Sequence, residues 1–220
     1  MYEQEVTDDG SITYRNPEVD ETYHSHSGAL NEALKKYVLP SGIDTHKGDI
    51  TVLDVCYGLG YNSFVALAWW LEHHAEEKIH FICLENDPEI IRLGSELKLS
   101  KTLQYPQKFF TEVAAHPGVL TNAPRCSGVL YLDDLRNQIP NLEANSVDMC
   151  FFDPFSPKKA PDLWTREIFA HIYRALKPGG TLTTYSCARK ARDAMREAGF
   201  RVEDGPTVGR RSPSTIAKKL

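Results

Sequence analysis

The sequence predicts an α/β fold with a doubly wound, mostly parallel β-sheet. Two observations lead to this prediction. From residue 50 onward, short apolar runs typical of buried strands recur about every 25–40 residues, and segments with helical spacing of apolar residues follow several of them. The residues with unusual chemistry come directly after these runs, and in such sheets ligands bind at the carboxyl ends of the strands.

Before residue 50 the chain is polar and acidic, and one regular element is expected there. Residues 1–22 are predicted to form a loose or short-stranded leader. Residues 27–38 carry three apolar pairs at the spacing of one helix face behind a Ser-Gly start, which predicts a helix. We therefore expect an N-terminal leader and helix, residues 1–48, packed on a core domain formed by residues 49–220.

The first half of the core domain alternates strands with helices. Residues 50–56 form an apolar run, and a glycine loop and a helix-like segment, 63–72, follow it. A second apolar run, 79–85, leads into segment 87–97, where an Asp cap and a Pro in the first turn predict a helix. Residues 128–132 form the third expected strand.

The second half continues the alternation. Residues 147–152 are the fourth apolar run, and segment 163–176 has its apolar residues on one side before a Lys-Pro-Gly-Gly stop. A fifth strand at 181–185 is followed by a helix at 188–198, which Gly199 ends. The last expected strands are 200–202 and 214–217.

Composition limits the class of protein. The 220 residues are 41% hydrophobic, so the chain can bury one sizeable core. No run of 18 apolar residues predicts a membrane span, and the acidic start does not resemble a secretory signal. The five cysteines lie far apart without a C-x-x-C pair, which predicts small buried side chains rather than zinc ligands or disulfides. We expect a cytoplasmic protein that is a monomer or a weak oligomer and binds no metal.

Charge is distributed unevenly over a chain whose formal net charge is −5. Residues 1–50 contain four Lys and Arg against ten Asp and Glu, whereas residues 189–220 contain nine against four. The basic C-terminal part is either a face for an anionic partner or the solvated sides of ordinary helices.

The first three strand ends predict a nucleotide pocket. Gly58 and Gly60 after the first strand allow a tight turn and a close approach to a ligand. Glu85 after the second strand can accept hydrogen bonds from both ribose hydroxyls. Asp133 and Asp134 after the third strand can accept from an adenine amino group. Helix capping is the alternative role for these acids. Asp54, at the first strand end, and Asp153, after the fourth strand, complete the candidate cofactor site.

The glycine loop also indicates which nucleotide binds. A dinucleotide fold usually has a third glycine where this chain has Ser63, and no Walker lysine follows Gly60. A ligand with an adenosine group but no phosphate therefore fits better. S-adenosylmethionine is positively charged at sulfur, which suits an acidic pocket.

The fourth strand ends in a candidate reaction site. Asp153-Pro154-Phe155-Ser resembles the [DN]-P-P-[FYW] motif of amino-group methyltransferases. In that motif the acid and the next carbonyl accept hydrogen bonds from an amine, and the aromatic ring stacks on a base. Holding the two reactants in line supplies a large part of the rate. The alternative is a proline-rich turn with a helix-capping Asp.

Several segments together resemble one enzyme family, the methyltransferase part of the MnmC tRNA wobble-uridine modification enzymes and their free-standing relatives without the flavin oxidase part. The segments are LDVCYGLGYNS, LEND, FFDPFSPKKAPDLWTREIF, LKPGGTLTTYSCARKARDAMREAGF and VGRRS. The resemblance covers roughly residues 22–217, and its specific part is 151–164 with the downstream KPGGTL. It implies a Rossmann-like class I S-adenosylmethionine-dependent methyltransferase fold with an antiparallel last strand.

The resemblance also implies an activity. This is methyl transfer from S-adenosylmethionine to the aminomethyl group of 5-aminomethyl-(2-thio)uridine in the tRNA anticodon, which gives 5-methylaminomethyl-(2-thio)uridine and S-adenosylhomocysteine. We expect no FAD, because 220 residues leave no room for the flavin domain. Two positions depart from the family pattern: Cys56 replaces the first glycine of the loop, and Asp133 replaces the glycine before the adenine-side acid.

Residue by residue, the resemblance assigns Asp153 to the reacting amine and gives Gly58, Gly60, Glu85 and Asp134 cofactor roles. The expected substrate-binding residues are Pro154, Phe155, Lys158, Lys159, Trp164, Arg210 and Arg211. Phe155 would stack on the uracil, and the basic residues would hold the tRNA backbone. Arg189, Lys190 and Arg192 would extend this basic rim.

Three alternatives remain open at this point. A methyltransferase for a small-molecule or protein amine would use the same cofactor residues. An aminopropyltransferase of the spermidine synthase type would have the same architecture, with more acidic residues around its amine substrate. A non-catalytic nucleotide-binding or RNA-binding module would bind without transferring a methyl group.

Overall fold

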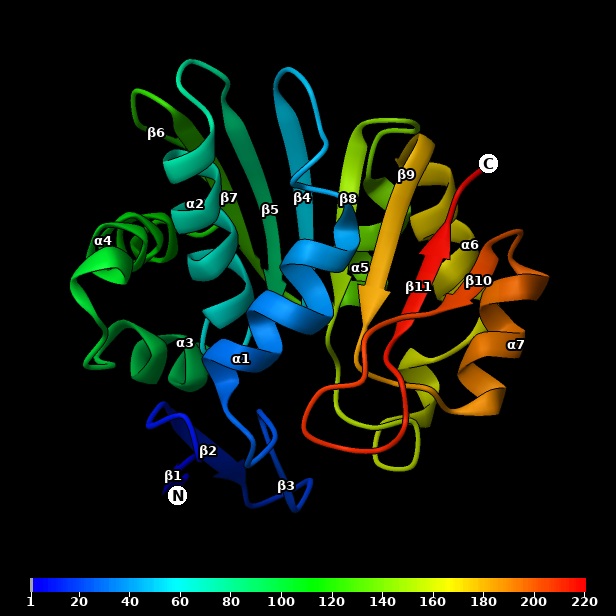
Figure 1. The fold of residues 1–220 in the computed structure, drawn as a ribbon, viewed down its shortest axis with the longest axis horizontal. Coiled ribbons are helices and arrows are strands. Elements are labelled where there is room, and N and C mark those ends of the chain that lie inside the picture. Colours follow the sequence, from blue (N-terminus) through cyan, green and yellow to red (C-terminus); the bar gives the residue numbers. More distant parts are fainter. Residues whose placement is uncertain (1) are drawn as a thin grey trace.

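The computed structural model describes residues 2–220, which form a large central sheet and a small N-terminal sheet (Figure 1). The central sheet has the strand order β10-β11-β9-β8-β4-β5-β7-β6. Its strands are β4 (Ile50–Val55), β5 (Ile79–Glu85), β6 (Thr121–Asn122), β7 (Cys126–Leu132), β8 (Val147–Phe152), β9 (Leu176–Thr184), β10 (Arg201–Asp204) and β11 (Thr215–Lys218). The N-terminal sheet consists of β1 (Glu3–Val6), β2 (Ile12–Asn16) and β3 (Glu21–Thr22).

The central sheet confirms the predicted architecture. The five strands from β7 to β9 pair in parallel, whereas β6, β10 and β11 pair antiparallel. From β4 the chain first builds outward through β5 and β7, then returns to place β8 on the other side of β4. The strand order therefore reverses between β4 and β8, and this switch point is where sheets of this type bind ligands.

Helices cover both faces of the central sheet (Figure 1). In chain order they are α1 (Ala29–Glu32), the π-helix η1 (Ala33–Val38), the 3-10 helix η2 (Leu39–Ser41), α2 (Tyr61–His73), α3 (Pro88–Ser95), α4 (Lys101–Ala115), α5 (Leu135–Gln138), the 3-10 helices η3 (Ile139–Asn141) and η4 (Pro161–Leu163), α6 (Arg166–Ala175) and α7 (Arg189–Glu197). Figure 1 shows η1, α2 and α4 on the near face and α5, α6 and α7 on the far face.

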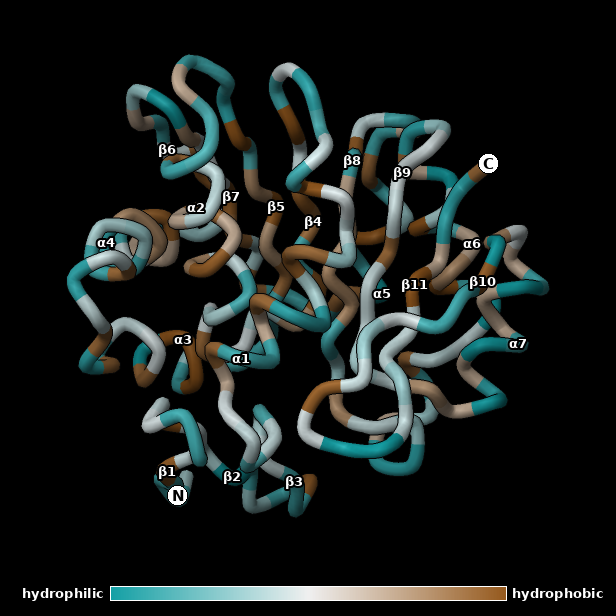
Figure 2. The backbone as a smooth tube through the Cα atoms, in the orientation of Figure 1, coloured by the Kyte–Doolittle hydropathy of each residue, from teal (hydrophilic) through white to brown (hydrophobic). Residues whose placement is uncertain are grey.

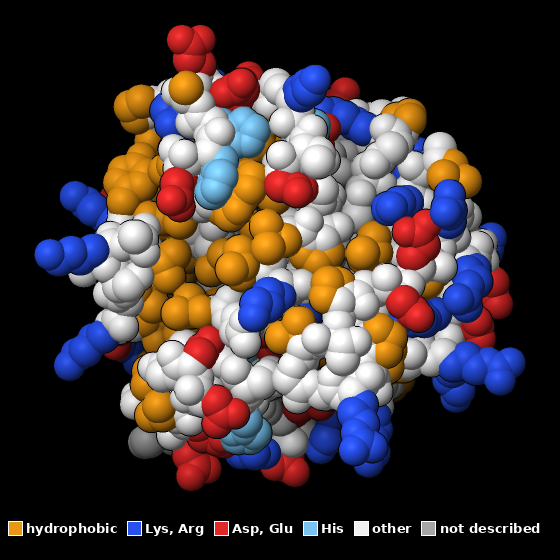
Figure 3. All heavy atoms as spheres, viewed as in Figure 1, with side chains coloured by type: hydrophobic (Ala, Val, Ile, Leu, Met, Phe, Trp, Pro, Cys, Tyr) orange, Lys and Arg blue, Asp and Glu red, His pale blue; other side chains and the backbone are white. Residues whose placement is uncertain are grey.

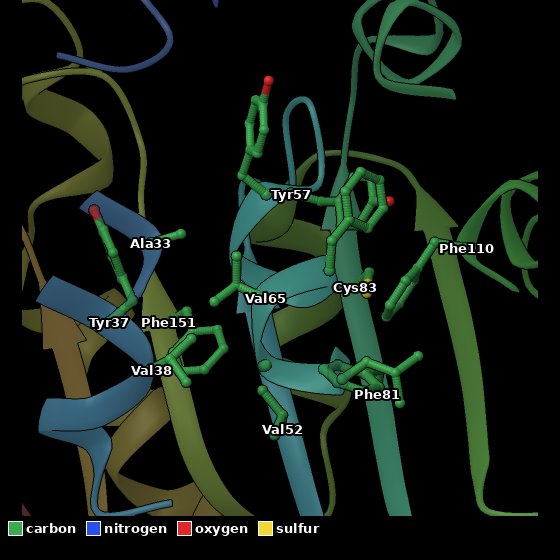
Figure 4. Close-up of a cluster of buried hydrophobic side chains, with 14 of the residues drawn as sticks. Ala33, Tyr37, Val38, Val52, Tyr57, Val65, Phe81, Cys83, Phe110 and Phe151 are labelled. Atoms are coloured by element: carbon green, nitrogen blue, oxygen red, sulfur yellow. The ribbon is translucent and has the colours of Figure 1, made fainter. Parts of the chain in front are cut away.

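Alternation along the strands produces a separate apolar core on each face. Phe151 packs in the core under η1, α2 and α4, whereas its neighbour Phe152 packs in the core under α6 and α7. Figure 4 shows the first core, where Val52, Phe81 and Phe151 from three strands lie near helical side chains. The tube in Figure 2 is correspondingly apolar along the central strands and polar in most loops. Because both faces are covered, the strands read as nearly continuous apolar runs.

Two features differ from the sequence-based expectation. Helix α4 (Lys101–Ala115) was not predicted, because Pro106 lies inside it and a proline ordinarily interrupts a helix. Leu103, Phe109 and Val113 nevertheless form a buried helical face. Strand β9 begins at Leu176 rather than 181, so the Lys-Pro-Gly-Gly segment belongs to an irregular start of the strand where its register against β8 shifts.

The short strands expected within residues 1–22 form the N-terminal sheet, which lies beside the carboxyl ends of the central strands (Figure 1). Asp87 caps α3 as predicted, accepting from the backbone N–H groups of Glu89 and Ile90. The hydroxyl of Tyr2 donates to the same Asp87 and so joins the N-terminal sheet to the rim of the core domain. Within residues 2–220, no helix combines the length and apolar character needed to cross a bilayer.

Candidate active site

A cavity of about 1010 Å³ lies between the N-terminal sheet and the carboxyl ends of β4, β5, β7 and β8. Its walls include Cys56 after β4, Glu85 at the end of β5, Asp134 after β7 and Asp153 after β8. Tyr23 from the N-terminal segment closes the opposite side. The acids that the sequence scatters over a hundred positions thus share one chamber, because parallel strands end at the same edge of a sheet.

The glycine loop connects β4 to α2 in a backbone conformation that few residues adopt. Cys56, Gly58 and Gly60 have φ angles of 63°, 57° and 88°. Gly60 caps α2, and a Cβ atom there would collide with the Tyr57 hydroxyl. Cys56 stands where the resembling family has glycine, and its positive φ explains why a glycine suits that position.

Glu85 is a buried acid that is hydrogen-bonded to this loop. One carboxylate oxygen accepts from the Gly58 N–H at 2.8 Å, and the other accepts from Asn86 and Asp87 at 2.8 and 3.0 Å. Burial raises the pKa of Glu85, while these three backbone N–H groups act in the opposite direction. The carboxylate is therefore fixed in orientation at the cavity wall, as a ribose-binding acid requires.

Asp133 and Asp134 both line the cavity after β7, and both are already hydrogen-bonded. Asp133 accepts from Gln138 at 2.7 Å and Asn137 at 3.0 Å, and these bonds lower its pKa. Asp134 caps α5 and pairs with Arg136, whose hydrogen bond lowers the pKa of Asp134. Capping, the alternative role considered from the sequence, is thus real for Asp134 and coexists with its place at the cavity.

Asp153 lies at the end of β8 on the same cavity and is held by two side chains. The Tyr37 hydroxyl donates to one carboxylate oxygen, and the Asn62 amide donates to the other at 2.8 Å. Burial raises the pKa of Asp153 well above its usual range, and the charge of Glu32 raises it further, while the two hydrogen bonds lower it. Sequence reasoning missed both partners, because Tyr37 and Asn62 belong to helices far from Asp153 along the chain.

The loop after Asp153 is rigid because its backbone is hydrogen-bonded at successive residues. Tyr185 donates its hydroxyl to the Pro154 carbonyl at 3.1 Å, and Trp164 donates its indole N–H to the Phe155 carbonyl at 2.9 Å. The Phe155 ring lines the cavity and meets Tyr23 edge to face, with centroids 4.9 Å apart. Phe155 and Asp153 therefore both lie on the cavity wall, two residues apart in a loop that is held in place.

Seven predicted site residues are outside the cavity lining: Asp54, Gly58, Gly60, Lys158, Lys159, Trp164 and Arg211. Asp54 is fully buried under the glycine loop, where it accepts from the Ser63 hydroxyl at 2.6 Å, and burial raises its pKa to about 7. Trp164 is 6% exposed and packs against Phe152 and Tyr185, so it supports the loop from the core. We expected Asp54 to contact the cofactor and Trp164 to contact the substrate. Instead, Asp54 is hydrogen-bonded to Ser63, and Trp164 is hydrogen-bonded to the loop after Asp153.

The predicted basic rim is only partly assembled. Arg210 lines the cavity and donates to the Tyr185 carbonyl, whereas Lys158, Lys159 and Arg211 are exposed outside the lining. Lys159 lies 3.9 Å from Asp20 of the N-terminal segment. Arg192 was expected on the rim but is engaged with Asp204 and with the Thr215 hydroxyl beside β11. Figure 3 shows basic side chains over the β10–β11 loop, next to the acidic N-terminal sheet.

The fold and this site agree with a family match. A family model described as S-adenosyl-L-methionine-dependent methyltransferase matches residues 98–220. The chain belongs to this family. The match contains β7, β8 and the Asp153 loop, whereas the glycine loop and Glu85 precede it in the chain.

Related sequences extend the likeness to the N-terminal part. A protein of Methanocaldococcus jannaschii without an assigned function is 32% identical over 97% of this chain and 58% of its own length. The tRNA 5-methylaminomethyl-2-thiouridine biosynthesis bifunctional protein MnmC of Ralstonia nicotianae is 30% identical over 90% of this chain. The chain spans 32% of the length of that bifunctional protein.

Among solved structures, an MnmC2 protein resembles this chain more strongly than a spermidine synthase does. The crystal structure of MnmC2 from Aquifex aeolicus superimposes with a TM-score of 0.87 at 30% identity, covering 99% of this chain and 70% of that one. Spermidine synthase from Thermotoga maritima superimposes with a TM-score of 0.60 at 16% identity, over 100% of this chain and 71% of that one. The likeness to MnmC2 includes sequence, whereas the likeness to spermidine synthase is one of fold.

Proposed function

We propose that the cavity binds S-adenosylmethionine with its adenine toward Asp133 and Asp134, its ribose on Glu85 and its sulfonium toward Asp153. The order β7, β5, β4, β8 along the sheet edge supports this orientation, since it sets these acids in a row. The chemistry of the lining residues also fits the ligand. The carboxylates suit a cationic sulfur and ribose hydroxyls, and the two glycines keep side chains away from the loop.

We propose further that the substrate is the aminomethyl group of 5-aminomethyl-(2-thio)uridine at the wobble position of tRNA. The observation that carries this proposal is the Asp153 carboxylate, oriented by Tyr37 and Asn62, with the Phe155 ring lining the same cavity. A carboxylate next to an aromatic edge suits an amine attached to a flat base. The names of the MnmC relatives point to the same nucleoside class.

The chemistry requires a neutral amine and an acceptor for its proton. The bound cofactor supplies an electrophilic methyl group. Asp153 would accept a hydrogen bond from the amine and orient its lone pair, and burial makes this carboxylate more basic than an ordinary Asp. The Pro154 carbonyl, the second acceptor in the amino-methyltransferase motif, already accepts from Tyr185. A carbonyl oxygen has two lone pairs, so the Pro154 carbonyl can accept from the amine as well.

A direct test uses labelled S-adenosylmethionine and two tRNA samples. One sample carries the terminal aminomethyl group at the wobble uridine, and the other already carries the methylated product group. Label should enter the first sample alone, at the aminomethyl nitrogen of the isolated nucleoside. Transfer to a free polyamine or a protein lysine with the tRNA left unlabelled would favour the small-molecule or protein alternative.

A further inference from the structure

A buried ion pair forms part of the cavity wall opposite the acids of the strand ends. Lys36 of η1 and Glu32 of α1 lie one helical turn apart, with Nζ and Oε1 separated by 2.6 Å. Their side chains are 3% and 8% exposed, and both residues line the cavity. Burying two charges costs desolvation free energy, which their mutual attraction often does not recover. An apolar pair would avoid this cost, so the ion pair calls for a functional explanation.

The charge balance of the cavity makes Lys36 unusual. Ten Asp and Glu residues line the cavity, but only three Lys and Arg residues do so among those that the structure describes. Arg136 is exposed and paired with Asp134, and Arg210 is exposed on the β10–β11 loop. Lys36 is the buried cation of the three, so an anionic group entering this acidic chamber has one well-placed partner.

Both members of the pair retain hydrogen-bonding capacity. Within residues 2–220, the Lys36 ammonium makes one hydrogen bond, to Glu32, and an ammonium has three donors. The Glu32 carboxylate also accepts from the Ser25 N–H at 2.9 Å. Burial acts to raise the pKa of Glu32, but the charges of Lys36 and His24 and the hydrogen bonds from Lys36 and the Ser25 N–H together outweigh it, so the net pKa of Glu32 is lowered. Together they present a positive and a negative group side by side.

The position of the pair matches the remaining end of the cofactor. Along the sheet edge, the adenine acids follow β7 and the ribose acid ends β5, so the chain beyond the sulfur reaches β4 and β8. Helices α1 and η1 lie over that side, near the start of α2 (Figure 1). Tyr37, the residue after Lys36 in η1, donates its hydroxyl to Asp153, and this contact places η1 beside the reacting end.

We propose that the Glu32–Lys36 pair binds the amino-acid end of S-adenosylmethionine, Lys36 receiving the α-carboxylate and Glu32 the α-ammonium. The proposal rests on the cofactor site proposed above and adds a selectivity to it. A decarboxylated cofactor lacks the group that Lys36 would bind and would leave that ammonium with Glu32 as its anionic partner. The pair thereby favours the methyl donor over the aminopropyl donor that an enzyme of the spermidine synthase type would use.

Calorimetry on the unmodified protein tests this with four ligands. S-adenosylhomocysteine carries both charged groups, while 5′-methylthioadenosine lacks both. S-adenosylmethionine and its decarboxylated form differ only in the carboxylate. We expect 5′-methylthioadenosine to bind at least about 100-fold more weakly than S-adenosylhomocysteine, and the decarboxylated form about 10-fold or more below its parent, from the usual strength of charge-assisted hydrogen bonds. Affinities within threefold of each other in both comparisons would overturn the proposal.

A double variant locates the effect. Glu32→Gln with Lys36→Met removes both charges together, because either single change would leave one buried charge without its partner. S-adenosylhomocysteine should then lose at least about 30-fold in affinity, while 5′-methylthioadenosine should bind as it does to the parent protein. Lys35→Met, at an exposed position of the same helix, is the matched control and should change neither ligand.

The outcomes distinguish failure of this proposal from failure of the cofactor-site proposal on which it rests. If the double variant folds and still prefers S-adenosylhomocysteine by the parental ratio, the pair does not bind the amino-acid end. If neither adenosine ligand binds the parent protein, the cofactor assignment itself is wrong. Should the double variant fail to fold, the ligand series on the unmodified protein decides the question alone.

Discussion

At the scale of single residues, the site depends on how each carboxylate is held rather than on its presence. Glu85 uses both oxygens on backbone N–H groups, whereas Asp153 receives two side-chain donors. Burial raises the pKa of both acids, and the charge of Glu32 raises that of Asp153 further. The two acids are accordingly suited to different tasks, the first to binding and the second to the reacting amine.

Replacing Glu85 with Ala should weaken S-adenosylhomocysteine binding by about 1.5–3 kcal/mol, the range for hydrogen bonds to a charged group. The loss includes the Gly58 N–H, which would no longer be tied to the cavity wall. Titration calorimetry measures it. Glu89→Ala is the control, because Glu89 lines the same cavity but pairs with Arg92 at the surface. Equal affinity in the Glu85 variant and the parent would remove Glu85 from the cofactor site.

Asp153→Asn should keep cofactor affinity within a few-fold while turnover on tRNA falls about 10²–10⁴-fold, the usual range for losing a general base. The variant is isosteric, and Tyr37 can still donate to its carbonyl oxygen. The Asn62 carbonyl oxygen is buried without a partner among the described atoms, so a flipped Asn62 amide can accept from the new side chain. Turnover at the parental rate would show that Asp153 does not act on the amine.

At the scale of elements, the loop between β8 and α6 is held from behind by the core. Trp164 lies in the apolar cluster under α6 and bonds the loop carbonyl at Phe155. The N-terminal sheet holds the same loop from the front, where Glu21 accepts from the Ser156 N–H at 2.8 Å. The loop is therefore held between Trp164 and the N-terminal sheet, which are more than a hundred residues apart in the sequence.

Truncating Trp164 to Ala should lower the free energy of unfolding by about 3–5 kcal/mol, as expected for a large aromatic side chain removed from a core. Chemical denaturation measures this directly. Calorimetry should show that the folded fraction binds S-adenosylhomocysteine normally, because Trp164 does not line the cavity. A variant of parental stability with weakened tRNA binding would instead return Trp164 to the substrate-contacting residues.

His24 should make the N-terminal sheet sensitive to acid. Burial lowers the pKa of His24 from 6.5 to about 4, against the opposing charges of Glu32 and Asp9. Since the folded-state pKa lies below the unfolded value, this stability is complete above pH 6.5 and is lost as pH falls toward 4. The loss amounts to about 3 kcal/mol at most.

Unfolding free energies at pH 7 and pH 4.5 test the role of His24. His24→Phe keeps an aromatic ring against Tyr61 and removes the titrating group, so its stability should fall less over this interval than that of the parent. His116→Phe, at an exposed position, should leave the parental pH dependence unchanged. Identical pH dependence in the His24 variant and the parent would contradict the prediction.

At the scale of the whole molecule, acidic and basic surfaces meet at the cavity mouth. The N-terminal sheet contributes acids there, and the β8–α6 and β10–β11 loops contribute Lys158, Lys159, Arg210 and Arg211 (Figure 3). An RNA backbone would be drawn to the loop side and kept off the acidic side. The net charge of −5 does not prevent this, because fields at a surface are screened within about 8–10 Å at ordinary salt concentrations.

Replacing Lys158 and Lys159 together with Ala should weaken tRNA binding and flatten its salt dependence. Each lost phosphate contact reduces the slope of log K against log salt by about 0.7–0.9. Cofactor affinity should not change, since neither lysine lines the cavity. Lys101→Ala with Lys108→Ala, two exposed positions on α4, is a control of equal charge. Coincident salt slopes for the two double variants would mean that the loop lysines do not contact RNA.

The sequence by itself determined the sheet, most helices and the place of the site. Apolar runs that end in Gly, Glu or Asp predict parallel strands with their polar residues at one edge, and the structure places Glu85, Asp134 and Asp153 there. Such signals are local, because a strand, its cap and the residue that follows it are neighbours in the chain. Helix α4 was not predicted in this way, because Pro106 interrupts its otherwise helical pattern.

Only the tertiary structure decided which side chains face the cavity. Asp54 and Trp164 stand in the right segments, yet they point into the core, while Tyr37, Asn62 and the Glu32–Lys36 pair reach the site from helices with no recognisable motif. The physical reason is that the side of an element which meets a cavity depends on how distant elements pack around it. Spacing along the chain fixes which residues share a face, but packing chooses what that face touches.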